Sequence, residues 1–411
     1  MREAREETDK TTETDKTRGK TSMTLKASLL ASAGAAAVMA LAAPAARAEG
    51  PVVKIGIAAA LTGDFAPYSE SAGARCMADT LNKAAGPDDP KIDLVIEDNR
   101  SDAQLSVSLG QKFVDDGAAV IAGVPFPDAL IPMAQMAAPA GVTVYSAPNS
   151  QVEMHEVGLD NFIAGAVPDP MNAAATAEAV AKAGGRNAVL LTSEDSGSWS
   201  AKTPEWFGEA LAQHGGKVVG RLNYAFGTTD WSPQIADIKA LAEKPDIVYV
   251  CAMVPDVGIL VRQLRSNGYE GFVVGCDGFD DPSFAETVGN PAFLDKVMFA
   301  THGVMGDGGR IDAFLASCKA AGYKVNGIFD ALGADMVAVV YDAAKAAGTN
   351  DPTALREAIR ASDGFKTVTS DKLSFKEKRE YPVKTIPVIG YRDGKRVVIA
   401  DVVPGFIPYL K

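Results

Sequence analysis

Polar and aromatic residues follow several apolar, β-branched stretches of the sequence, and they are the residues best suited to chemistry. Each lies where a predicted strand ends and before a predicted helix begins. Ligands of open α/β sheets bind outside the carboxyl ends of the strands, so we expect these loops to converge on one cleft. The candidates in these loops are Tyr68, Phe126, Asn149, Ser150, Trp199, Met253 and Asp277.

The sequence contains none of the common catalytic or nucleotide-binding motifs. A P-loop, a GxGxxG turn, a GxSxG elbow, HExxH and CxxC are all absent. The three histidines, His155, His214 and His302, are far apart in the sequence, so we expect neither a catalytic triad nor a zinc site. We therefore predict a binding protein without cofactor or metal. An enzyme on the same type of scaffold is the alternative, which a turnover assay on amides or esters would reveal.

Strand-like and helix-like segments alternate from about residue 50 onward. The first strand, Val52–Ala58, leads through a Gly-containing turn into a helical segment, Ala72–Lys83. Strands that alternate with helices of about ten to fifteen residues indicate βαβ units, hence parallel sheets covered by helices on both faces. The strand candidates are too many for one sheet of typical size, so we predict an α/β protein of two lobes.

Interruptions of this alternation place the predicted lobe boundaries. They are Val167-Pro168-Asp169-Pro170, the His-Gly-rich residues 301–309, and residues 369–372. We predict lobe one from residues 49–167 and 302–371, and lobe two from residues 168–301 and 372–411, joined by a three-segment hinge. Near the C-terminus, Asp393-Gly394 between two strand-like segments is typical of a tight hairpin turn.

Five stretches spread over residues 51–402 form a recognisable pattern. They are PVVKIGIAAALTGDFAPY at 51–68, DDG at 115–117, DIVYV at 246–250, VRQLRSNGY at 261–269 and ALGADMVAVVYDAAKAAG at 331–348. Together they resemble the type I periplasmic solute-binding proteins of the leucine/isoleucine/valine-binding family. The resemblance implies two lobes, each a mostly parallel sheet flanked by helices. It also implies the substrate-binding component of an ABC importer, which captures an amino acid or amino-acid-like ligand and delivers it to an inner-membrane permease.

The resemblance also implies roles for individual residues. In that family, loops after the third and fourth strands hold the ligand's α-carboxylate, and a carboxylate of lobe two holds its α-ammonium. By position, Asn149 and Ser150 match the carboxylate loop, and Asp277 matches the acid that holds the ammonium. The remaining matches are Tyr68 at the first turn, Trp199 at an aromatic lid, Met253 at a lobe-two aromatic position and Phe329 at an aromatic contact. We expect lobe one to supply Phe126 as well, from a loop that departs from the family pattern.

The loop Pro125–Asp128 departs from the serine-rich loop that is typical of amino-acid binders. Proline lacks a backbone N–H donor, and Met253 stands where the family has a tyrosine. Relatives of this family also bind aromatic acids and amides, so the resemblance implies these as alternative ligands. A ligand-sensing receptor of the same fold is an alternative function, because a fold does not by itself specify a function.

The N-terminal residues indicate export. Residues 1–22 are charged and Thr-rich, and we expect a disordered extension or an over-called start, with translation beginning at Met23. Residues 23–48 combine a basic start, a short apolar run and Ala46-Arg47-Ala48, as in a cleaved secretory signal peptide. An uncleaved anchor helix is the alternative. We expect the mature chain in the periplasm.

The net charge indicates which kinds of molecule the protein binds, and the cysteines raise the question of a disulfide. The formal net charge is −12, which argues against nucleic acid, because no basic cluster could neutralise phosphates. We expect a monomer whose partners are a small molecule and the permease. Cys251 and Cys276 lie near the ends of predicted neighbouring strands and are candidates for a disulfide. The alternative is that all four cysteines, with Cys76 and Cys318, are small buried apolar residues.

Overall fold

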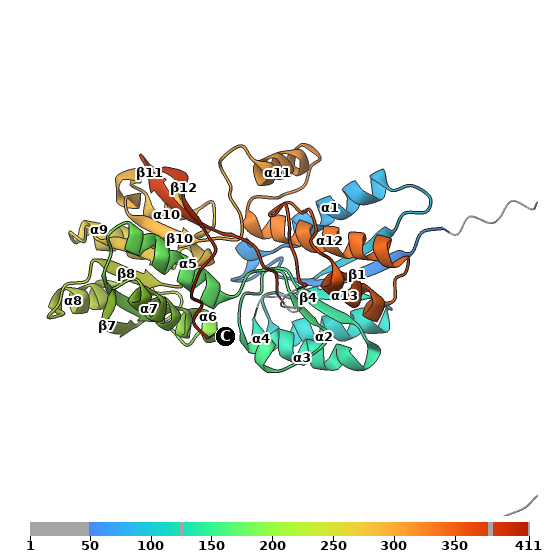
Figure 1. Cartoon of the computed structure of the whole chain (residues 1–411), viewed down its shortest axis with the longest axis horizontal. Coiled ribbons are helices and arrows are strands. Elements are labelled where there is room, and N and C mark those ends of the chain that lie inside the picture. The colour runs from blue at the N-terminus through green and yellow to red at the C-terminus, as the bar shows by residue number, and fades with distance from the viewer. Residues whose placement is uncertain (1–48, 124–125, 377–380, 410–411) are drawn as a thin grey trace, which may run out of the picture. The chain divides into compact units, whose positions relative to one another are not determined.

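The computed structural model describes residues 49–123, 126–376 and 381–409. The predicted extension 1–22 and signal peptide 23–48 lie outside these residues. Two β-sheets organise the part from residue 49 onward (Figure 1). The first has the order β2-β1-β3-β4-β5 and is parallel throughout. Its strands are β1 (Val52–Ala59), β2 (Lys91–Asp98), β3 (Val120–Gly123), β4 (Thr143–Ser146) and β5 (Phe162–Ala164).

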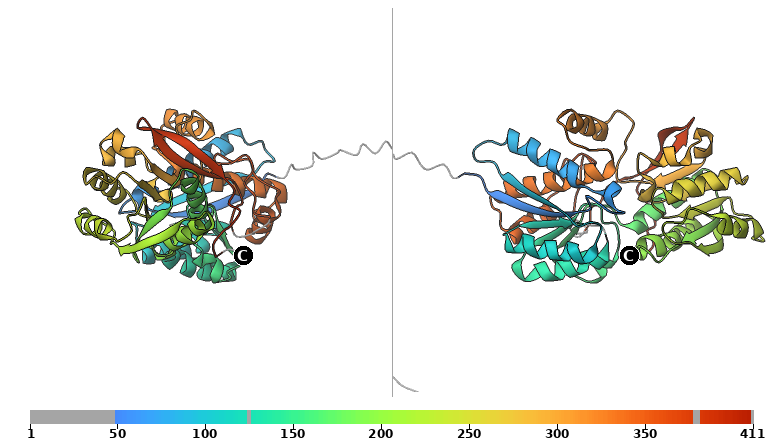
Figure 2. Two further views of the ribbon diagram at one scale, coloured as in Figure 1. Left: turned by 60° about the vertical axis from the view of Figure 1, so that its left-hand side comes forward. Right: turned by 180° about the vertical axis from the view of Figure 1, so that it is seen from behind.

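The second sheet has the order β12-β11-β10-β9-β8-β6-β7. It is parallel from β6 to β10 and continues into an antiparallel hairpin of β11 and β12 at one edge. Its strands are β6 (Asn187–Thr192), β7 (Lys217–Asn223), β8 (Ile247–Val250), β9 (Phe272–Gly275), β10 (Val297–Ala300), β11 (Ile386–Arg392) and β12 (Lys395–Val402). Figure 2 shows the hairpin as a twisted pair. Asp393 and Gly394 form its turn with positive φ values of 53° and 73°, which confirms the predicted hairpin.

Helices cover both faces of the first sheet (Figure 1). They are α1 (Ser71–Ala84), α2 (Ala103–Asp115), α3 (Pro127–Ala137), α4 (Glu153–Glu156), α11 (Arg310–Ala320), α12 (Ile328–Ala347) and α13 (Pro352–Ala361). In β1, Ile55 and Ile57 pack in one cluster with α1 and α12. Gly56 between them lies against Phe113 of α2. This alternation follows from the two-residue period of a strand.

The second sheet is covered in the same way. Its helices are α5 (Asp169–Lys182), α6 (Gly197–Ala201), α7 (Thr203–Gln213), α8 (Ser232–Ala240), α9 (Asp256–Ser266) and α10 (Phe284–Val288). Tyr249 of β8 stacks on Phe207 of α7, with ring centroids 4.0 Å apart. The neighbouring Val248 belongs to a cluster with Leu260 of α9. Short 3₁₀ turns complete the fold: η1 (Ala66–Tyr68), η2 (Ala138–Ala140), η3 (Asp277–Phe279) and η4 (Pro291–Leu294).

The chain passes between the two sheets three times. It does so between β5 and α5, between β10 and α11, and between α13 and β11. Helices α11 to α13 return to the first sheet, where α12 packs along α1 and α13 along α12 and β4. Among the described residues, no helix combines the length and apolar character that a membrane span requires.

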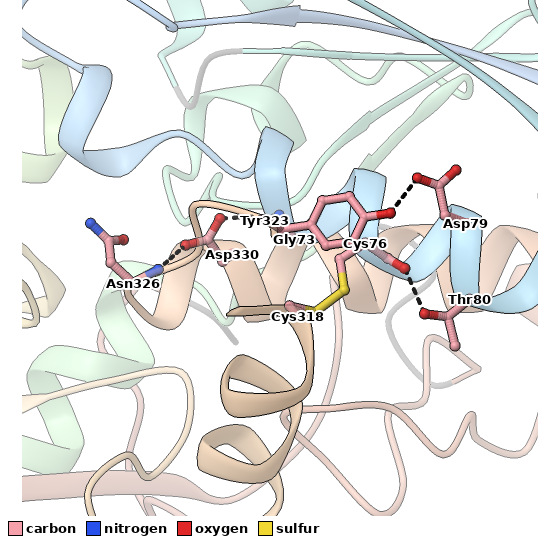
Figure 3. The surroundings of a disulfide bond; sticks show 8 residues. All are labelled: Gly73, Cys76, Asp79, Thr80, Cys318, Tyr323, Asn326 and Asp330. Atoms are coloured by element: carbon pink, nitrogen blue, oxygen red, sulfur yellow. Dashed lines mark hydrogen bonds between the residues drawn. A yellow bond between two sulfur atoms is a disulfide. The ribbon is translucent and has the colours of Figure 1, made fainter. Parts of the chain in front are cut away.

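The cysteine pairing differs from both expectations. A disulfide joins Cys76 of α1 to Cys318 of α11, with their Cα atoms 5.9 Å apart (Figure 3). Cys251 and Cys276 are buried free thiols, so the candidate disulfide between them was wrong. They directly follow Val250 and Gly275, which are partners in the parallel register of β8 and β9. Adjacency in a sheet does not by itself provide the side-chain geometry that a disulfide requires.

Candidate ligand-binding site

A small cavity lies where loops from both sheets meet. Its walls come from segments that follow the carboxyl ends of β1, β3, β4, β6, β8 and β9, and from the start of α12. The cavity has a volume of about 50 Å³. By the same measure one water molecule needs about 10–15 Å³, so the cavity has room for more than one. The lining residues are Ala60, Phe65, Tyr68, Phe126, Pro148, Ser150, Gln151, Trp199, Met253, Asp277, Gly278 and Phe329.

The structure brings together all but one of the residues that the sequence suggested as a site. Around the cavity lie Tyr68, Phe126, Ser150, Trp199, Met253, Asp277 and Phe329. Asn149 is the exception: it is fully buried and is not among the lining residues. The convergence follows from topology, because parallel strands carry their carboxyl ends to the same edge of a sheet. Whether these residues bind a ligand stays a prediction.

The sequence reasoning missed other lining residues. Phe65 lies in the same turn as Tyr68, and its ring approaches that of Phe126 to 4.5 Å between centroids. Pro148 and Gln151 flank the suggested pair Asn149-Ser150. These residues lie in loops that the sequence analysis had selected, and this position was the only indication that the sequence offered for them. The choice between neighbouring loop residues depends on side-chain direction, which the sequence pattern does not encode outside regular strands and helices.

The side chain of Asp277 is a carboxyl group in the cavity wall, and two protein groups form hydrogen bonds with it. Its Oδ1 accepts a hydrogen bond from Nε1 of Trp199 at 2.8 Å, and its Oδ2 lies 2.9 Å from Nε2 of His302. Burial by itself raises the pKa of Asp277, but the bond and the charge of His302 and the Trp199 bond outweigh burial and hold the pKa below its usual value. The described cavity therefore contains a carboxylate that favours its ionised form.

His302 was noted in the sequence only as an isolated histidine. It follows the carboxyl end of β10, the strand beside β9, and its side chain is fully buried. An ionised carboxylate only accepts hydrogen bonds, so Nε2 of His302 is the donor. Nδ1 is buried without a partner among the described residues.

Asp169 is a second buried carboxyl group close to the cavity. It begins α5, is fully buried, and its backbone N–H donates to the carbonyl of Ser150 at 2.9 Å. Burial raises the pKa of Asp169, and the negative charge of Asp277 raises it further. The two carboxyl groups therefore differ in direction: the pKa of Asp277 is lowered and the pKa of Asp169 is raised.

Hydrogen bonds connect the elements of the two sheets beside the cavity. The backbone N–H of Val254, after β8, donates to the Tyr68 hydroxyl at 3.0 Å. Glu153 of α4 accepts from the N–H of Ser198 in α6 at 2.8 Å and from its hydroxyl at 2.5 Å. Tyr68 and Phe329 meet edge to face, with centroids 5.2 Å apart. Among the described residues, no group of three or more His, Cys, Asp or Glu side chains could hold a metal ion.

Comparison with known proteins gives a consistent match. The family model described as "Periplasmic binding protein" matches residues 52–394. The Leu/Ile/Val-binding protein BraC3 of Rhizobium johnstonii is 28% identical over 236 residues, which span 56% of this chain and 63% of that protein. This match therefore covers less than two thirds of that relative's length.

Solved structures show the same fold. The branched-chain amino acid transporter substrate-binding protein LivJ from Streptococcus pneumoniae, in complex with isoleucine, superposes with a TM-score of 0.72 at 23% identity. The alignment covers 84% of this chain and 97% of LivJ. An ABC transporter solute-binding protein from R. palustris, in complex with benzoate, gives 0.70 at 22% identity and covers 86% and 97% of the two chains. The predicted two-lobed type I fold is confirmed.

Proposed function

Because the chain belongs to the periplasmic binding protein family, we propose that it is the substrate-binding component of an ABC importer. It captures a small polar ligand, an amino acid or an amino-acid-like compound, between its two lobes and delivers it to an inner-membrane permease. The observation that carries this proposal is the cavity that loops of both sheets line, with the carboxylate of Asp277 in its wall.

The ligand site in this proposal consists of the residues that the sequence suggested. Asp277 provides the negative charge for an ammonium group, and a charge-assisted bond of this kind contributes on the order of 1.5–3 kcal/mol. Tyr68, Phe126, Trp199 and Phe329 remove the ligand from water. Ser150 supplies a hydroxyl group, and the fully buried Asn149 belongs to the same loop. The benzoate-bound relative and the aromatic lining make an aromatic acid the second candidate ligand.

The proposal also covers location and partners. The mature chain acts in the periplasm after cleavage of the signal peptide, as a monomer that binds no nucleic acid and catalyses no reaction. The Cys76–Cys318 disulfide supports an oxidising compartment. A ligand-sensing receptor of the same fold differs from this proposal only in its protein partner, so an uptake assay in a strain without the gene separates the two.

A thermal-shift screen of the purified mature chain tests the binding function. The panel holds aliphatic and aromatic amino acids, amides, aromatic acids, polyols, small polyamines and small quaternary ammonium compounds. A specific ligand at a hundredfold excess over its Kd adds about 2.7 kcal/mol of stability, which raises the melting temperature. Mass spectrometry of the recovered compound should show it unchanged. We expect a hit that Asp277→Asn abolishes, and a screen in which no compound raises the melting temperature would contradict the proposal.

A further inference from the structure

The charges around the cavity have one sign. Among the described residues, the cavity wall holds Asp277 and no lysine or arginine. The adjoining pocket shares Phe65 and Phe126 with the cavity, and its ionisable lining residues are Asp128, Glu153, Glu194 and Asp195. Asp281 and Asp277 both act on the Tyr68 hydroxyl with their negative charge. Such walls attract a cation and repel a carboxylate.

Three basic side chains from segments around the second sheet are engaged away from the cavity wall. His302 donates to Asp277, and Nζ of Lys384 donates to the backbone carbonyl of His302 at 2.5 Å. Arg396 pairs with Asp280 at 2.6 Å. None of these groups lines the cavity. A ligand carboxylate would therefore meet no described basic side chain in the wall.

Two side chains of the cavity wall, Asp277 and Gln151, offer acceptor oxygens to a ligand. Each oxygen of Asp277 already accepts one hydrogen bond, from Trp199 or His302, so only its second lone pair remains for a ligand. Gln151 lines the cavity, is 2% exposed, and its Oε1 has no partner among the described residues. A primary ammonium group carries three N–H donors, and donors left without acceptors in a buried site are costly. A quaternary ammonium group carries the same charge and no N–H.

Aromatic rings make up most of the remaining wall. Phe65, Tyr68, Phe126, Trp199 and Phe329 all line this one small cavity. A cation within about 6 Å of an aromatic ring centroid is attracted by the ring's negative face, and several such rings together recognise methylated ammonium groups. The negative charge of Asp277 adds to this attraction without needing a direct hydrogen bond.

We propose that the ligand of this cleft is a small quaternary ammonium compound. Its cation lies among the five aromatic rings with Asp277 as counter-charge, and the unpartnered Gln151 oxygen accepts one hydroxyl donor of the ligand. This inference rests on the proposed function, in that the cleft binds a small molecule, and it narrows the class of that molecule. It disfavours benzoate-like anions, because the wall offers a negative charge and no basic side chain.

Isothermal titration calorimetry of the purified mature chain tests the ligand class with a matched pair. Choline is compared with 3,3-dimethylbutan-1-ol, its uncharged carbon analogue of the same shape, and tetramethylammonium, leucine and benzoate complete the series. We expect choline to bind at least a hundredfold more tightly than the uncharged analogue. Equal affinity of the two would overturn the inference.

Two substitutions test separately the contribution of the Asp277 charge and that of an aromatic ring to choline binding. Asp277→Asn should weaken choline binding at least tenfold and leave the uncharged analogue unchanged. Phe329→Leu should weaken choline about tenfold, whereas Phe406→Leu, at an exposed aromatic outside the cavity, should not. Thermal melts without ligand check that each variant folds, and the comparison of the two ligands on the wild type needs no variant.

The outcomes distinguish this inference from the proposed function. Binding of leucine or benzoate without binding of choline or tetramethylammonium refutes the ligand class and leaves the proposed function intact. Failure of all these compounds refutes the ligand class, and the broader thermal-shift panel then decides the proposed function separately.

Discussion

At the scale of single residues, two buried carboxyl groups show how hydrogen-bond donors change a carboxyl pKa. Asp277 and Asp169 are both buried and close enough to influence each other, yet the pKa of Asp277 is lowered and that of Asp169 is raised. The difference lies in donors: Trp199 and His302 bond to Asp277, whereas burial raises the pKa of Asp169 more than the side chain of Ser150 lowers it. Environments that separate two acidic pKa values in this way are typical of functional sites.

Glu70 gives a testable case of the same physics. Burial raises the pKa of Glu70 from its usual 4.5 to about 8. Between these values the folded chain holds a proton that the unfolded chain has lost. The free energy of unfolding therefore falls as pH rises from about 4.5 to 8. Glu70→Gln removes this contribution, so urea unfolding at pH 5 and pH 8 should show a smaller loss of stability in the variant.

The same two titrations provide the control for Glu70. Other groups also titrate in this range, but they are common to both proteins, so only the difference between wild type and variant is interpreted. An identical pH dependence in wild type and Glu70→Gln would show that the Glu70 carboxyl does not titrate as predicted.

At the scale of elements, α1 and α12 approach each other backbone to backbone. A Cβ atom on Gly73 would lie 1.8 Å from the carbonyl oxygen of Asp330, and one on Gly333 would lie 2.1 Å from that of Glu70. The N–H of Gly73 also donates to Oδ1 of Asp330 at 3.1 Å (Figure 3). The Cys76–Cys318 disulfide fastens the same helix α1 to α11. Glycine is therefore needed at this contact for space.

Gly73→Ala should destabilise the protein although alanine favours a helix interior more than glycine does. The added methyl group meets backbone, which cannot rotate away, and overpacking of this kind costs about 1–3 kcal/mol or more. Urea unfolding of the oxidised chain measures the effect. Gly86→Ala is the matched control, because the nearest atom to its Cβ is Oδ2 of Asp89 at 3.4 Å. Equal stability of the two variants would contradict the close contact.

At the scale of the whole molecule, elements of the two sheets are bonded to each other beside the cavity. The Tyr68–Val254 bond and the two Glu153–Ser198 bonds each join a segment of the first sheet to one of the second. A ligand stabilises a closed state only through contacts that the open state lacks. The Tyr68–Val254 and Glu153–Ser198 bonds join the two lobes without a ligand. They therefore contribute to the free-energy difference between the open and closed forms of the ligand-free chain.

Glu153→Ala should shift the ligand-free chain toward open conformations, because both bonds to Ser198 are lost. Small-angle X-ray scattering without ligand should then show a larger radius of gyration than for the wild type. Glu178→Ala removes a carboxylate from an exposed pair with Lys182 within α5 and should leave the radius unchanged. A radius in Glu153→Ala that matches the wild type would mean that these bonds do not control closure.

The sequence by itself determined the alternation of strands and helices, the C-terminal hairpin and the set of loops that form the cavity. Apolar periodicity and turn residues are local signals, and parallel strands bring their carboxyl ends to one edge of a sheet. This is why Tyr68, Trp199 and Asp277, distant in the chain, were expected together and line one cavity.

Only the tertiary structure decided which side chains pair. Cys76 bonds to Cys318 across 242 residues, and the two cysteines on adjacent strands stay free. His302 bonds to Asp277, and Gln151 rather than Asn149 faces the cavity. These outcomes depend on the packing of helices on sheets and on side-chain directions in loops. Both are set by contacts between residues far apart in the chain, which no local pattern of the sequence records.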